Sequence, residues 1–149
     1  MANNRLYDKG RNSFAKGDIH WKASGGDTFK MFLVDLDVYD TPDFEADEFA
    51  SDIPTAARIG NNGGSADSDA PALTPADPVA GVCDAADLSV EAVPAGGALE
   101  AIVIYKSTGN LATSPLIAFI DTATNLPITP VGADIPVIWN NGANKIFKL

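Results

Sequence analysis

Acidic side chains provide the densest candidate chemistry in this sequence. Asp35, Asp37, Asp40 and Asp43 follow the pattern D-x-D-x-x-D-x-x-D. If a strand continues through this region, Asp35 and Asp37 share one face at a separation of about 7 Å. Calcium takes about six to eight oxygen ligands, which carboxylates supply readily. Asp35, Asp37 and Asp40 are therefore the candidate metal ligands, but the pattern lacks the central glycine of an EF-hand loop. We expect a solvated acidic strand end without a bound metal.

Nucleophilic catalysis is a second candidate chemistry, because the chain has one histidine, His20, and one cysteine, Cys83. A Cys/His pair can act as nucleophile and base. However, His20 falls on the face opposite Ile19 and Trp21 in a predicted strand over 18–22, and Cys83 precedes a turn. We expect an exposed histidine and a small buried thiol. One histidine and one cysteine also fall short of the three or four ligands of a typical zinc site.

Sequence motifs for other chemistries are absent. The chain has no G-x-S-x-G, no G-x-x-x-x-G-K-[ST] and no dinucleotide-type G-x-G-x-x-G. Trp21 and Trp139 could present rings to a sugar, but their alternating strand positions favour core or interface roles. We therefore predict a non-enzymatic protein with no catalytic residue and no cofactor.

Charge narrows the range of partners. Asp and Glu number 20 against 10 Lys and Arg, which gives a net charge of -10 and a pI near 4.2. Nucleic acids and anionic membranes are bound mainly through Lys and Arg, so we expect neither partner. A single cysteine excludes an intrachain disulfide and favours a reducing compartment. The polar N-terminus has no apolar signal core, and no apolar run approaches the ~20 residues of a membrane helix. We expect synthesis in a cytoplasm.

Short apolar runs separated by Gly, Pro and Asn predict the elements that position these residues. Their β-branched composition is typical of antiparallel strands. The longest candidate is 28–39, whose second face turns acidic near Asp35 and therefore leaves the core there. The remaining predicted strands cover 18–22, 88–92, 100–106, 115–121, 126–129, 135–139 and 145–149. Residues 53–59 and 79–82 are additional candidates.

Two segments depart from this pattern. Asn3 and Asn4 are good N-cap residues for a helix over 6–16 that ends at Gly17, and an extended arm is the alternative. Residues 60–78 contain almost no large apolar side chain, so we expect a long surface loop. The whole chain, 1–149, is predicted to form a single β domain with an N-terminal arm or helix over 1–17.

The predicted architecture is all-β. We expect an antiparallel β-sandwich of about eight short strands with one small helix, in which a jelly-roll arrangement is one option. A closed small barrel is the alternative.

Several blocks of the sequence resemble a family of small tailed-bacteriophage virion proteins. The resemblance begins at 4–11 (NRLYDKGR) and is densest in the last third of the chain. It is carried there by 101–106 (AIVIYK), 114–118 (SPLIA), 120–124 (IDTAT), Pro127, Trp139, Asn141-Gly142 and 145–149 (KIFKL). It covers most of the chain except about 60–80, and these blocks characterise a scaffold, not an active site.

The resemblance implies a capsid decoration, or cement, protein. Such a protein binds the outside of the major capsid shell and holds neighbouring capsomers together, so its expected location is the capsid exterior of a virion. Its partners are the major capsid protein and further copies of itself, as a dimer or a trimer. The arm residues Arg5, Leu6, Tyr7 and Arg11 are the expected contact with a partner, because they are basic and apolar against an acidic body.

Two other functions remain open. One is a tail- or fibre-associated binding module with a sugar-facing aromatic patch around Trp21 or Trp139. The other is a calcium-binding β domain that uses Asp35, Asp37 and Asp40.

Overall fold

A five-stranded antiparallel sheet forms the centre of the molecule. The computed structural model describes residues 4–149, and the strand order of this sheet is β1-β7-β6-β2-β3. β2 and β6 pair along their full length, from Thr28 opposite Ser107 to Val34 opposite Ala101. The strands are β1 (Arg5–Leu6), β2 (Thr28–Val34), β3 (Arg58–Ile59), β6 (Ala101–Ser107) and β7 (Leu116–Ile120).

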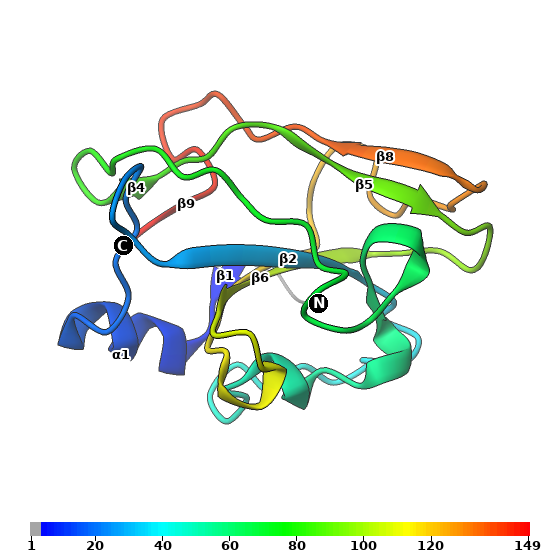
Figure 1. Cartoon of the computed structure of the whole chain (residues 1–149), viewed down its shortest axis with the longest axis horizontal. Coiled ribbons are helices and arrows are strands. Elements are labelled where there is room, and N and C mark those ends of the chain that lie inside the picture. The colour runs from blue at the N-terminus through cyan, green and yellow to red at the C-terminus, as the bar shows by residue number, and fades with distance from the viewer. Residues whose placement is uncertain (1–3) are drawn as a thin grey trace.

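Two smaller antiparallel ribbons cover one face of this sheet. β4 (Val82–Cys83) pairs with β9 (Phe147–Lys148), and β5 (Leu88–Val93) pairs with β8 (Ala133–Val137). Figure 1 shows β5 and β8 running above β2 and β6, with β4 and β9 beside them. The larger apolar core lies between these layers and includes Trp21, Phe29, Met31, Ile104 and Ile117.

The opposite face is covered by the helix and by irregular segments. α1 (Asp8–Lys16) packs on β7, and the acidic segment that follows β2 continues the cover. Four short 3₁₀ turns lie among the described residues at Ala50–Asp52, Thr55–Ala57, Asn61–Gly63 and Leu111–Thr113. A second apolar cluster fills this side, with Tyr7, Phe32, Tyr105 and Phe119 fully buried.

The two-sided cover explains the composition of the central strands. Every residue of β7 and the first five of β6 are buried. A strand that is covered on both faces has no solvent side, so its sequence is continuously apolar and does not alternate. The outer strand β8 alternates instead, with Ile135 and Val137 buried between exposed neighbours.

α1 approaches the sheet closely because of Gly10. A Cβ atom at this position would lie 2.2 Å from the carbonyl oxygen of Leu116 in β7. Gly10 weakens the isolated helix, but it allows the backbone contact that seats α1 on the sheet. The helix ends at Gly17, which adopts φ 78° and donates its N–H to Phe14 and Ser13 carbonyl oxygens, as a left-handed C-cap does.

The structure confirms an all-β, sandwich-like fold of antiparallel strands with one short helix. The N-terminal segment differs in detail from its prediction, because residues 5–6 form a strand and the helix begins at Asp8. Asn3 lies outside the described residues. Asn4 does not cap the helix, since its side chain accepts hydrogen bonds from the backbone N–H groups of Asp121 and Thr122.

Some predicted strands are shorter or absent. Residues 18–22 are irregular, although Ile19 and Trp21 point into the core as their alternation suggested. The strand expected over 28–39 ends at Val34, and only Arg58–Ile59 of 53–59 is extended in the sheet. In these irregular segments some side chains are still buried in the cores, but the backbone does not pair with a neighbouring strand.

Residues 60–78 are mostly irregular, as composition predicts, but they are not simply a surface loop. Their central part returns to the edge of β2, where the Met31 N–H donates to the Pro71 carbonyl and the Leu73 N–H donates to the Phe29 carbonyl. Ala70 and Leu73 are buried. Small apolar residues and main-chain hydrogen bonds hold this central part to the sheet, although it has few large side chains.

Within residues 4–149, no helix has the length and apolar character needed to cross a membrane.

Candidate functional site

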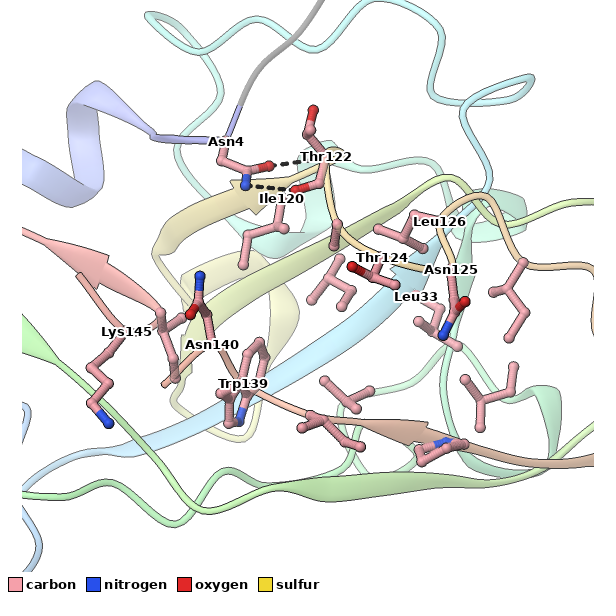
Figure 2. A pocket seen from close by; sticks show the side chains of 18 residues that line it. Asn4, Leu33, Ile120, Thr122, Thr124, Asn125, Leu126, Trp139, Asn140 and Lys145 are labelled. Atoms are coloured by element: carbon pink, nitrogen blue, oxygen red, sulfur yellow. Dashed lines mark hydrogen bonds between the residues drawn. The ribbon is translucent and has the colours of Figure 1, made fainter. Parts of the chain in front are cut away.

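A groove with a volume of about 780 Å³ lies between the two layers of the sandwich. Figure 2 shows its two sides, with the end of β7 and the 121–128 loop facing β8 and the segment that follows β8. Its floor and walls are mainly apolar. The apolar lining comprises Leu33, Ile102, Ile120, Ala123, Leu126, Ile128, Ile135, Pro136, Val137, Ile138, Trp139 and Ile146.

Neutral polar side chains form much of the rim of this groove. Thr122, Thr124, Asn125 and Asn140 lie around its opening, and Asn4 is tied to Thr122 by hydrogen bonds to both its backbone N–H and its carbonyl oxygen. Lys145 is the one ionisable residue of the lining. A groove of this kind suits apolar contact with a few hydrogen bonds at the edge, and it offers no acid/base pair.

A second recess lies between α1 and the last strand. It has a volume of about 420 Å³ and is lined by Leu6, Arg11, Phe14, Ala15, Lys148 and Leu149. We refer to this set as the α1–β9 hollow. Arg11 and Lys148 are exposed, so two cationic side chains border an apolar floor.

The predicted docking residues of the arm separate into two groups. Leu6 and Tyr7 are buried, with Tyr7 fully enclosed, because β1 pairs with β7. Arg5 and Arg11 are exposed, and the Arg5 guanidinium lies 4.2 Å from the centre of the Phe44 ring. Residues 5–6 therefore belong to the sheet and Arg11 belongs to α1. The two exposed arginines are the members that a partner can reach without unfolding the segment.

The prediction that Asp35 and Asp37 share one face of a strand is wrong. Residues 35–37 leave the sheet in a turn, in which the Asp35 carboxylate accepts a hydrogen bond from the Asp37 N–H. The backbone turns there because the Asp35 N–H bonds to Ala57 and the Leu36 N–H bonds to the Glu100 carboxylate. Across residues 4–149, no three His, Cys, Asp or Glu side chains are grouped closely enough to hold a metal ion.

The histidine and the cysteine lie in different environments. His20 is exposed, and its imidazole lies 3.6 Å from the Asp27 carboxylate. Cys83 is fully buried, and burial raises the pKa of its thiol to about 11. A thiol with this pKa is protonated at neutral pH and is a poor nucleophile.

Both tryptophans are core residues. Trp21 is 3% exposed and Trp139 is 6% exposed, and their indole N–H groups donate to the carbonyl oxygens of Asp84 and Ala86. Neither ring presents an open face to solvent, so they do not form the aromatic platform that a sugar-binding patch around them requires.

An ionic cluster around Asp67 is the main feature that the sequence did not predict. The Asp67 carboxylate accepts hydrogen bonds from the Lys30 ammonium at 2.8 Å, from the Tyr105 hydroxyl at 3.0 Å and from Ser107. Burial alone raises the pKa of Asp67, but its hydrogen-bond donors outweigh that effect and hold the pKa below its ordinary value. The cluster fastens the 60–78 segment to β2 and β6.

A second polar cluster fastens the acidic segment to the sheet. The Tyr39 hydroxyl donates to the Asp47 carboxylate, and the buried Tyr7 and Tyr39 hydroxyls lie 3.2 Å apart. Burial raises the pKa of Tyr39 well above its ordinary range, so its hydroxyl keeps its proton. No local sequence signal indicates the Asp67 cluster or the contact between Tyr7 and Tyr39, because these partners lie more than 30 residues apart in the chain.

The sequence matches no family model, and a search of curated proteins finds no match.

Proposed function

We propose that this chain is a non-enzymatic decoration protein of a tailed-bacteriophage capsid. It binds the outer surface of the major capsid shell and stabilises the assembled particle. The observation that carries the proposal is the resemblance of the blocks at 4–11, 101–106, 114–118, 120–124 and 145–149 to small phage virion proteins.

The positions of these blocks in the fold are compatible with this role. The resembling segments 101–106, 114–118 and 145–149 contribute to β6, β7 and β9, and 4–11 contributes β1 and the start of α1. They build the central sheet and its cover, so they set the scaffold on which contact surfaces are placed. Function on a common scaffold depends on those surfaces and not on the fold.

Surface chemistry gives further support. A net charge of -10 favours solubility and limits non-specific self-adhesion while the subunit is made at high concentration. The fold contains no disulfide bond among the described residues, and its single cysteine, Cys83, is free and buried in the core. Both properties suit a subunit that folds in a reducing cytoplasm before it joins a particle.

Mass action explains how binding of this chain would stabilise the capsid. A protein that binds the assembled shell, and not free capsomers, shifts the assembly equilibrium toward the shell. Many identical sites on one particle allow a modest contact at each site to produce a large total effect. The exposed Arg5 of β1 is the arm residue that we assign to this contact.

The proposal is tested on virions of the phage that encodes the chain. Quantitative mass spectrometry should find it at a copy number comparable to that of the major capsid protein, and cryo-electron microscopy should place it on the outer shell. Its absence from purified virions, or density on the tail, would refute the proposal.

A binding experiment tests the contact. Particles that lack the chain should release DNA at a lower temperature, and purified chain should restore their heat resistance. Arg5→Ala should weaken this restoration, whereas Lys22→Ala, a change of another exposed cation outside the arm, should not. Equal restoration by both variants would remove Arg5 from the contact.

A further inference from the structure

Charge is unevenly distributed over the surface. Residues 31–57 contain eight carboxylates and no Lys or Arg, whereas residues 4–22 contain five Lys or Arg and two Asp. The acidic residues of the first stretch are Asp35, Asp37, Asp40, Asp43, Glu45, Asp47, Glu48 and Asp52. The chain therefore carries a basic region on a body that is otherwise acidic.

The α1–β9 hollow lies in the basic region and is partly apolar. Leu149 is 52% exposed at its edge, and its N–H donates to the Gly81 carbonyl in the tight turn between Val79 and Val82. Val79 is also largely exposed. The exposed Leu149 side chain, which lines the hollow with Arg11 and Lys148, calls for a partner that is both apolar and acidic.

The chain carries a segment with that chemistry in the acidic turn, which we define as residues 35–40. Val38 is exposed there between Asp37 and Asp40, which are exposed as well. The turn is held firmly, because Tyr39 is buried and its N–H donates to the Asp35 carbonyl. It presents an apolar side chain flanked by carboxylates at little cost in conformational entropy.

The acidic turn and the hollow lie at opposite ends of β2. The turn directly follows Val34, the last residue of the strand. At the other end, Lys106 is paired with Phe29 and its ammonium bonds to the Asp18 carbonyl, just beyond α1. Seven residues of strand separate these ends by about 20 Å, and Figure 1 shows α1 and β9 on the side of the molecule from which β2 starts. The turn therefore cannot reach the hollow of its own chain.

We propose that a second copy of this chain docks head to tail, with its acidic turn in the α1–β9 hollow. Val38 of one copy contacts Phe14 and Leu149 of the next. Asp37 and Asp40 then lie near Arg11 and Lys148. A contact of hollow against hollow would bring like charges together, so the charge pattern favours docking of the acidic turn in the hollow.

Two variants test the proposal with the purified full-length chain. Val38→Asp disables the turn, and Arg11→Glu disables the hollow. Each should weaken self-association in sedimentation velocity by about tenfold, which corresponds to about 1.4 kcal/mol. The key measurement is made on a mixture of the two variants. Val38→Asp keeps an intact hollow, and Arg11→Glu keeps an intact acidic turn. The mixture should form a one-to-one heterodimer and nothing larger.

Matched controls separate this contact from general charge effects. Lys9→Glu changes an exposed cation of α1 outside the hollow, and Val131→Asp changes an exposed apolar residue outside the acidic turn. Both should associate like the unchanged chain. Circular dichroism should show the same fold for all variants, and added salt should weaken the association.

Three outcomes would overturn the proposal: a monomer at all concentrations, variants that associate like the unchanged chain, or a mixture that stays monomeric. None of these outcomes bears on capsid binding, which is measured on particles. Conversely, a chain that is absent from virions could still associate head to tail, so the two ideas fail separately.

Discussion

Removal of the Asp67 carboxylate should destabilise the protein through a specific electrostatic mechanism. The Lys30 and Asp67 side chains are 16% and 11% exposed, and the ammonium and carboxylate lie 2.8 Å apart. Loss of one member of a shielded pair leaves the other charge poorly compensated. In Asp67→Asn, Lys30 still donates to the residue-67 carbonyl, at 2.7 Å in the structure, so the loss is partial.

The expected magnitude follows from the bonds that are changed. Hydrogen bonds to charged groups contribute about 1.5–3 kcal/mol each, and the amide of Asn retains an acceptor for Tyr105 or Ser107. We therefore expect Asp67→Asn to lower the free energy of unfolding by about 2 kcal/mol. For a domain of this size that corresponds to a fall in Tm of about 4–8 °C. Urea unfolding followed by circular dichroism measures the difference.

The effect should depend on pH. The pKa of folded Asp67 lies below its ordinary value, so the carboxylate stabilises the fold above the unfolded-state pKa. This contribution disappears as pH falls through the folded-state pKa, because Asp67 of the unchanged protein is then protonated and, like Asn, carries no charge. The difference between Asp67→Asn and the unchanged chain should be full at neutral pH and should shrink in strong acid.

A double-mutant cycle provides the decisive control. Lys30→Met removes the other charge, so its cost and that of Asp67→Asn should be non-additive. Glu45→Gln removes an exposed carboxylate and should change stability by less than about 0.5 kcal/mol. Additive effects in the cycle, or a pH-independent effect of Asp67→Asn, would refute the assignment of the pair.

Three further predictions concern the core. Gly10→Ala should lower the free energy of unfolding in urea by about 1–3 kcal/mol, because the added Cβ meets the Leu116 carbonyl. The control Asn12→Ala, on the exposed side of α1, should leave the stability unchanged or raise it. Cys83 should resist a thiol reagent in the folded chain up to about pH 9 and react fully in denaturant; rapid reaction in the folded state would contradict its burial. Tyr39→Phe should cost about 1–2 kcal/mol in thermal unfolding through loss of its hydroxyl contacts, and an unchanged Tm would show that they contribute nothing.

The sequence by itself determined the class of the fold and its most regular strands. The runs at 100–106 and 115–121 are continuous, apolar and β-branched, and they became β6 and β7. The alternation at 88–92 predicted β5, and Gly17 marked the end of the helix. These features are local, since a few neighbouring residues set both backbone preference and the face that is buried.

The tertiary structure alone decided where non-local partners meet. Gly10 weakens its helix locally, and only its distance from β7 explains why it is there. Tyr7 looked like part of an exposed arm but is buried because β1 joins the central sheet. Asp67 looked like a loop residue but meets Lys30 and Tyr105.

The candidate sites show the same division. The acidic cluster at 35–40 is plain in the sequence, but a turn, not a strand, sets its geometry. The groove and the α1–β9 hollow join residues from both ends of the chain, such as Asn4 with Asn140 and Leu6 with Leu149. Local pattern cannot encode such pairings, because they depend on strand order, and strand order is decided by which apolar faces pack together.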